Sequence, residues 1–222
     1  MLNIIARSAT DKLKIRRSMS RLFQAFIYSI IPSKEHQGYK HTSGKIFKST
    51  NFRIRYFDSR FEIDFTSRNK EYEKTVAMQI LKEGLKLGAV HFADTTVSIV
   101  ERHTDKRELI ASGFVCAAIK NNVTGKKIFL EPGEAKHNTI ITNHSLQKYE
   151  TLTGKAYEGD LKIDVLKQQD EGRFFYYGNT PYKAWFATYR ITAEVEMIDL
   201  LLDTGLGGDS MKNLGFLELK SE

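Results

Sequence analysis

The chain has 222 residues, 41% of them hydrophobic and 27% charged, which is enough to bury one large core or two small ones. A single cysteine, Cys116, excludes an internal disulfide and a thiolate metal cluster, and no apolar stretch approaches the roughly 20 residues that span a bilayer, so we expect a cytoplasmic protein. The net charge is +7, but residues 1–60 hold 13 Lys and Arg against three Asp and Glu, and this concentrated basic charge favours a polyanionic partner over an evenly solvated surface.

The first hundred residues predict strands and helices in the order βαββαβ. The expected elements are a strand at 2–6, a helix at 19–31, hairpin strands at 46–56 and 61–65, a helix at 71–87 and a strand at 90–100. This order is that of the ferredoxin-like split βαβ unit, whose antiparallel sheet leaves one face open for a ligand.

The second half repeats the pattern less clearly. The expected elements are an apolar segment at 109–119, a short strand at 127–130, a helix at 134–152, paired strands at 161–166 and 173–177, a strand at 184–191, a helix at 195–202 and a final strand. With a boundary near residues 102–108, the sequence predicts an α+β fold of two tandem ferredoxin-like units. The N-terminal domain would comprise residues 1–105 and the C-terminal domain residues 106–222.

The helix at 19–31 has two distinct faces. One is an apolar stripe at helical spacing. The other face repeats at i, i+4, i+7 and i+11 and consists of Arg17, Arg21, Gln24 and Tyr28. Tyr28 therefore projects from a basic face, although a half-buried boundary ring is the simpler interpretation of its position.

Residues 32–48 concentrate histidine, lysine and tyrosine in a predicted loop with two glycines. They include His36, His41, Lys34, Lys40, Lys45, Lys48 and Tyr39. Imidazole is the side chain best suited to proton transfer near neutral pH, and functional groups gather on loops held by a rigid scaffold. The histidines lack the spacing of metal ligands, so we expect neither a metal nor a cofactor.

Near the C-terminus, four glycines lie within 11 residues, at Gly205, Gly207, Gly208 and Gly215. Such glycines can bring bare amides against a phosphate. The segment neither follows a first strand as a dinucleotide-binding loop does nor ends as a P-loop does. Taken alone, it is explained equally well by a helix cap and a tight turn into the last strand.

Three of these motifs, in this order, carry a resemblance to a known family. They are the helix that ends at Tyr28, the run His-Gln-Gly-Tyr-Lys from His36 to Lys40 followed by Lys-Ile-Phe at 45–47, and the C-terminal Gly-Leu-Gly followed by Gly-Phe at 215–216. Together with the segment 148–160, they resemble the CRISPR repeat-processing endoribonucleases of the sixth Cas family, which belong to the RAMP superfamily.

The resemblance implies metal-independent cleavage of CRISPR precursor RNA within its repeats. The 2′-OH beside the scissile phosphate would attack, leaving a 2′,3′-cyclic phosphate and a 5′-OH. His36 would be the general acid or base, Lys40 would stabilise charge, and Tyr28 would orient the nucleophile or phosphate. The family usually has one more residue between the histidine and the Gly-Tyr-Lys element, so His41 is an alternative to His36.

By the same resemblance, the partner is CRISPR repeat RNA, with other subunits of a CRISPR effector complex also open and a monomer or homodimer as the assembly. The expected RNA contacts are Arg17, Arg21, Lys45, Lys48, Gly205, Gly207, Gly208, Lys212 and Gly215. Two other functions stay open: a non-catalytic RNA-binding RAMP subunit of an effector complex, against which the presence of both Tyr28 and His36 argues, and an unrelated phosphate-ligand enzyme, which the missing nucleotide motifs disfavour.

Overall fold

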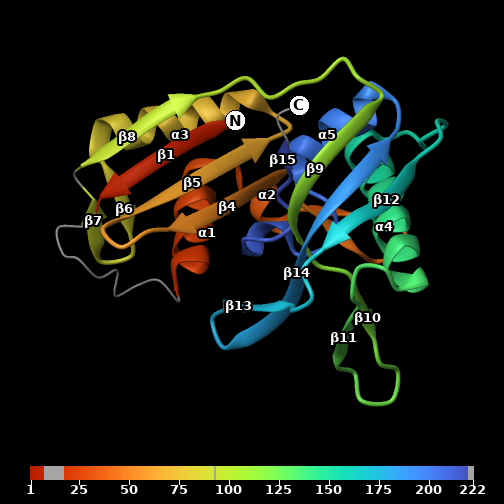
Figure 1. Cartoon of the computed structure of the whole chain (residues 1–222). Coiled ribbons are helices and arrows are strands. Elements are labelled where there is room, and N and C mark those ends of the chain that lie inside the picture. The colour runs from red at the N-terminus through yellow and green to blue at the C-terminus, as the bar shows by residue number, and fades with distance from the viewer. Residues whose placement is uncertain (8–17, 93, 220–222) are drawn as a thin grey trace.

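The computed structural model describes residues 1–7, 18–92 and 94–219, and its two main sheets are drawn from successive parts of the chain (Figure 1). The N-terminal part contains β1 (Leu2–Arg7), α1 (Met19–Ile30), α2 (Ser33–Gln37), β2 (Tyr39–Lys40), β3 (Ile46–Phe47), β4 (Thr50–Tyr56), β5 (Arg60–Ser67), α3 (Lys70–Glu83), β6 (Leu85–Leu87), β7 (Val90–Phe92) and β8 (Thr95–Ile99). Its main sheet has the order β4-β5-β1-β8 and is antiparallel throughout.

The C-terminal part builds a second sheet of the same design. It contains β9 (Glu108–Val115), β10 (Ala118–Lys120), β11 (Lys127–Phe129), α4 (Ala135–Thr153), β12 (Lys162–Gln168), β13 (Arg173–Tyr177), β14 (Thr180–Thr192), α5 (Val195–Thr204), the 3-10 turn η1 (Ser210–Lys212) and β15 (Glu218–Leu219). The sheet order β12-β14-β9-β15 places the four strands in the same relative order as the first sheet. The two tandem ferredoxin-like units are therefore confirmed.

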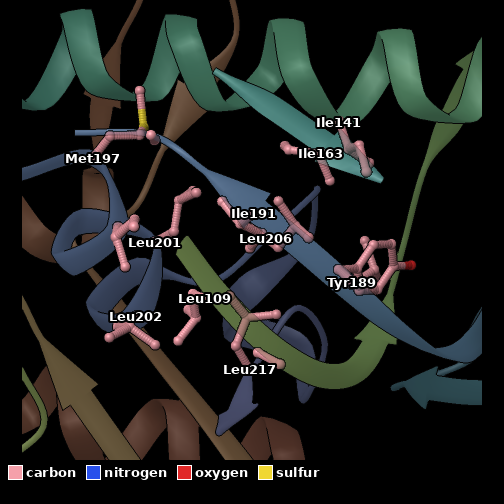
Figure 2. Packing of buried hydrophobic residues seen from close by; sticks show 14 of the residues in the cluster. Leu109, Ile141, Ile163, Tyr189, Ile191, Met197, Leu201, Leu202, Leu206 and Leu217 are labelled. Atoms are coloured by element: carbon pink, nitrogen blue, oxygen red, sulfur yellow. The ribbon is translucent and has the colours of Figure 1, made fainter. Parts of the chain in front are cut away.

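Each unit has its own hydrophobic core between its helices and its sheet. The N-terminal core is rich in phenylalanine, and its fully buried rings are Phe23, Phe52, Phe61 and Phe65. The C-terminal core is mainly aliphatic. Figure 2 shows side chains from β9, β12 and β14 meeting those of α4 and α5, among them Leu109, Ile163, Ile191, Ile141 and Leu201.

Several predicted boundaries are corrected by turn residues and by strand pairing. The helix expected to reach residue 87 ends at Glu83, because Gly84 adopts φ 72° and residues 85–87 form β6. The strand expected at 46–56 is divided into β3, which pairs with β2, and β4, which pairs with β5. The strands expected to pair with each other, β12 and β13, instead pair with different parts of the long strand β14.

The two units are joined by buried polar contacts as well as by the chain. Arg102, in the connection between them, is 9% exposed and donates to the carbonyl oxygens of Leu202, at 2.7 Å, and Leu217. Burial lowers the pKa of Arg102 to about 10. From β5, the Thr66 hydroxyl donates to the Asp203 carbonyl at 2.8 Å. These bonds fix α5 and the glycine-rich segment against the N-terminal sheet.

Candidate active site

Helix α1 presents Tyr28 at the edge of the N-terminal core. The ring packs against the core while Phe23 and Ile27 fill it. The phenol oxygen is buried, and the Thr50 side chain interacts with it. Burial raises the pKa of Tyr28 well above its usual range. The hydroxyl therefore stays protonated at neutral pH.

His36, which the sequence placed in a loop, lies on the short helix α2. The buried carboxylate of Glu35 anchors this helix by accepting hydrogen bonds from the Tyr39 hydroxyl, at 2.7 Å, and from the Ser49 hydroxyl. His36 lies on the exposed side, and its ring centre is 4.9 Å from that of Tyr28. Glu35 thus fixes the helix, while the neighbouring imidazole remains accessible.

Lys48 is the lysine that the fold brings to this pair. Its Nζ lies 5.5 Å from the centre of the Tyr28 ring and donates to the backbone carbonyls of Glu35, at 3.4 Å, and His36. Burial lowers the pKa of Lys48, and the Glu35 carboxylate opposes that shift. Tyr28, His36 and Lys48 therefore form one cluster, although only Tyr28 and His36 were predicted as members of the catalytic set.

The other two predicted catalytic residues lie elsewhere. Lys40 is exposed on β2 and pairs in register with Ile46. His41 is directed toward α4, with Nε2 3.2 Å from a Glu150 carboxylate oxygen and Nδ1 2.8 Å from the Ser43 hydroxyl. Both ring nitrogens of His41 thus have partners within the protein, whereas His36 is exposed.

A cleft of about 290 Å³ is lined by Lys48, one member of the Tyr28–His36–Lys48 cluster. It is bounded by α1, β3, α4 and the glycine-rich segment, and its lining includes Gln24, Gln37, Phe47, Lys48, His144, Lys148, Gly207, Asp209 and Lys212. The N-terminal unit thus supplies one wall and the C-terminal unit the other.

The glycines of the C-terminal segment approach the protein's own backbone. A Cβ on Gly207, where φ is 73°, would stand 2.7 Å from the carbonyl oxygen of Cys116. A Cβ on Gly215 would stand 2.5 Å from the Leu206 carbonyl, and one on Gly205 would strike the Asn51 amide. These contacts account for three glycines without a ligand. Their predicted role in RNA binding stays a prediction.

The remaining predicted RNA contacts are spread around the cleft. Gly208 donates its N–H to the Cys116 carbonyl at 2.9 Å. The Lys212 ammonium is bound by Asp209 at 2.5 Å and by the Tyr182 hydroxyl at 2.7 Å. Burial lowers the pKa of Lys212, but the bond to Asp209 outweighs it and the net shift is upward. Lys45 donates to the Gln147 side chain at 2.8 Å.

The two predicted arginines lie on or before α1. Arg21 is exposed on that helix, near the β13–β14 turn at Gly178. Arg17 lies outside the described residues.

Two cleft residues were assigned no role from the sequence, His144 and Lys148. They are one turn apart on α4, and Lys148 shares the buried face of that helix with Ile141 and Leu152. A lysine in the apolar stripe of a predicted helix was the available signal. The contacts of that lysine depend on which segments pack against this face of the helix, and the sequence did not show those segments.

Within the described ranges, no group of three or more His, Cys, Asp or Glu side chains is arranged to hold a metal ion. In the same part of the chain, no helix is both long and apolar enough to cross a bilayer.

The sequence model of the family CRISPR associated protein Cas6, C-terminal, matches residues 99–219, more than half of the chain. The chain belongs to this Cas6 family. The match contains the whole C-terminal sheet and the glycine-rich segment. No curated protein matches the chain in sequence.

Solved structures of Cas6 and RAMP proteins share the fold over nearly the full chain. A Cas6-related protein from Pyrococcus furiosus has a TM-score of 0.77 at 16% identity, covering 100% of this chain and 98% of its own. A RAMP protein described as binding different RNA substrates has a TM-score of 0.74 at 14% identity, covering 100% of both chains. A Cas6 product complex has a TM-score of 0.66 at 10% identity, covering 98% of both chains. At these identities the likeness establishes the two-unit fold.

Proposed function

We propose that this Cas6 family member is a metal-independent endoribonuclease that cuts CRISPR precursor RNA within its repeats. The observation that carries the proposal is the meeting of Tyr28, His36 and Lys48, of which Lys48 also lines the cleft between the two units. Transesterification by the ribose 2′-OH needs proton transfer and stabilisation of a charged phosphorane, and this cluster supplies groups for both.

The three side chains take distinct roles in this proposal. The accessible His36 imidazole transfers a proton, either from the 2′-OH or to the departing 5′-oxygen. Lys48 stabilises the developing negative charge, the role that the sequence had given to Lys40. Tyr28, whose ring lies beside His36 and Lys48, helps to orient the nucleophile or the phosphate.

The charge distribution supports RNA as the substrate. The first 60 residues carry the excess positive charge, and the described part of this stretch includes Tyr28, His36 and Lys48. We assign the catalytic residues to a domain at 1–105 and the glycine-rich segment to a domain at 106–222. A cytoplasmic monomer or homodimer that binds repeat RNA, alone or with effector subunits, fits this assignment.

The test is incubation with CRISPR-repeat RNA in EDTA, followed by analysis of the cut ends. We expect a single defined cut with a 2′,3′-cyclic phosphate and a 5′-OH. A repeat with 2′-deoxyribose before the scissile bond should bind and stay intact, because the nucleophile is missing. Cleavage that needs added magnesium, or that proceeds on the 2′-deoxy substrate, would contradict the mechanism.

A non-catalytic RNA-binding subunit is the second candidate, and the same assay separates it. Such a protein binds both RNAs and cuts neither. The exposed His36 ring, which lies tilted beside that of Tyr28, favours the enzyme, since binding alone needs no accessible proton-transfer group at that position.

A further inference from the structure

Lys148 is a cation in the wall of the cleft with its side chain almost fully enclosed. It is 2% exposed, yet it lines the cleft together with His144, one turn earlier on α4. Among the described residues, no carboxylate forms an ion pair with it; its Nζ donates instead to the carbonyl oxygens of Thr204, at 3.2 Å, and Gly205, at 2.5 Å. These carbonyls lie at the C-terminal end of α5, where the helix dipole is negative.

Two carbonyls leave this ammonium incompletely satisfied. A lysine ammonium has three donors, and the described residues accept from two of them. A buried cation without a counter-charge is costly. Accordingly, burial lowers the pKa of Lys148 to about 7. The Lys148 ammonium therefore lacks a negative counter-charge among the described residues, and a bound anion would supply one.

His144 adds a second unmatched polar group at the same place. Its Nδ1 is buried and has no hydrogen-bond partner among the described residues, while the ring packs edge-on against Phe47 at 4.8 Å between centres. Burial lowers the pKa of His144 well below its usual range, and the positive charges of Lys148 and Lys45 add to that shift. A neutral imidazole offers one N–H donor to a ligand.

The other charged groups facing the cleft do not neutralise Lys148. From the N-terminal wall comes Lys48, bound to backbone carbonyls. From the glycine-rich segment come Asp209 and Lys212, and Asp209 is already bound by Lys212 and, at 2.9 Å, by Lys127. The cleft therefore keeps an excess of positive charge and unfilled donors, which suits an anion.

We infer that His144 and Lys148 form a phosphate subsite for the bound RNA strand, with the Lys148 ammonium as the counter-charge of one phosphodiester and His144 as a neutral donor to it. This inference rests on the proposed function, since the phosphate belongs to the RNA. A phosphate beside Lys148 favours its charged form, so binding takes up a proton above pH 7. Affinity should fall as the pH rises, by up to about tenfold per pH unit.

The experiment measures the dissociation constant of a 2′-deoxy repeat RNA from pH 7 to pH 9 at fixed salt. The proteins are wild type, Lys148→Met, and Lys136→Met as a control on the exposed side of the same helix. We expect the wild type and the control to lose affinity with rising pH. Lys148→Met should bind about 10- to 100-fold more weakly at pH 7 and show little further pH dependence.

Other outcomes overturn the inference in distinguishable ways. If the wild type binds and cuts repeat RNA while Lys148→Met keeps its affinity and pH profile, only the subsite is wrong. A variant with a lower melting temperature but an unchanged pH slope would show that Lys148 merely caps α5. Wild-type protein that binds no repeat RNA would refute the proposed function, and the subsite with it.

The wild-type pH profile decides the matter even where Lys148→Met does not fold, since a flat profile overturns the inference. His144→Ala provides a second variant. It should weaken binding by less than Lys148→Met and retain the pH slope, because the titrating ammonium is still present. Loss of the slope in His144→Ala would instead assign the titration to the histidine and overturn the role of Lys148.

Discussion

In the N-terminal unit, the connection after the first helix carries α2, β2 and β3, whereas in the C-terminal unit the β10–β11 hairpin comes before the first helix and a glycine-rich segment follows the second. The main sheets have equivalent strand orders. The differences lie in these connections, and they bring different chemistry to the cleft. His36, from the N-terminal side, is exposed, while Lys148, from the C-terminal side, is enclosed.

The N-terminal unit thus contributes an accessible imidazole, that of His36, and the C-terminal unit contributes a buried ammonium, that of Lys148. Duplicated scaffolds keep their cores because packing constrains them, and their connections diverge because they lie at the surface. The proposed division of labour can be tested one wall at a time.

The largest expected effect belongs to the N-terminal wall. His36→Ala should slow single-turnover cleavage by about 10²- to 10⁴-fold while repeat binding survives, because a positioned imidazole is worth that much in proton transfer. His41→Ala is the matched control and should cost much less, since that ring is held by Ser43 and Glu150. A reversed order would move the role to His41. Rates unchanged in both variants would argue against histidine catalysis.

The next effect concerns the stability of the C-terminal wall. Gly207→Ala should destabilise the fold by more than the about 1–2 kcal/mol that a left-handed backbone costs a non-glycine residue, because its Cβ meets the Cys116 carbonyl. Gly44→Ala is the control, with φ 83° and nothing within 4 Å of the added Cβ. Urea unfolding of both variants measures the difference. Equal losses would mean that the segment relaxes around the new methyl group.

Lys148, on the same wall, should make the free energy of unfolding depend on pH. Its pKa is about 7 in the folded protein against 10.5 for the unfolded chain, so between these values the unfolded state binds more protons. The free energy of unfolding should therefore gain a contribution that rises with pH from about 7 to 10.5, by at most about 1.4 kcal/mol per pH unit. Urea titrations at several pH values should show a flatter profile for Lys148→Met. Identical profiles would contradict the buried, neutral lysine.

The smallest effect is expected from an exposed lysine at the rim. Lys45→Ala should weaken RNA binding and lower the slope of log affinity against log salt by about one, if Lys45 contacts a phosphate, while cleavage at saturating protein stays nearly unchanged. Lys48→Ala should differ from it by also slowing cleavage, since Lys48 contacts the Tyr28 ring and the His36 carbonyl. An unchanged salt slope in Lys45→Ala would show that Lys45 contacts no phosphate and binds only Gln147.

The sequence by itself determined the repeated ferredoxin-like architecture and the family. Periodic apolar residues predicted the cores of α1 and of the main strands, because burial of one face is a local pattern in the chain. Motifs spaced along the chain also predicted that Tyr28 and His36 belong together. Their rings are neighbours in the fold.

Only the tertiary structure decided which lysine joins that pair and what forms the opposite wall. Lys40 lies nearer to His36 in the chain, but the turn between β3 and β4 carries Lys48 back to the carbonyls of α2. The sequence assigned Lys148 no role, and only the fold brings its ammonium to the carbonyls at the end of α5. Such contacts join segments far apart in sequence, and no local pattern encodes them. Burial and charge pairing depend on what finally packs against each side chain, which is a property of the folded molecule.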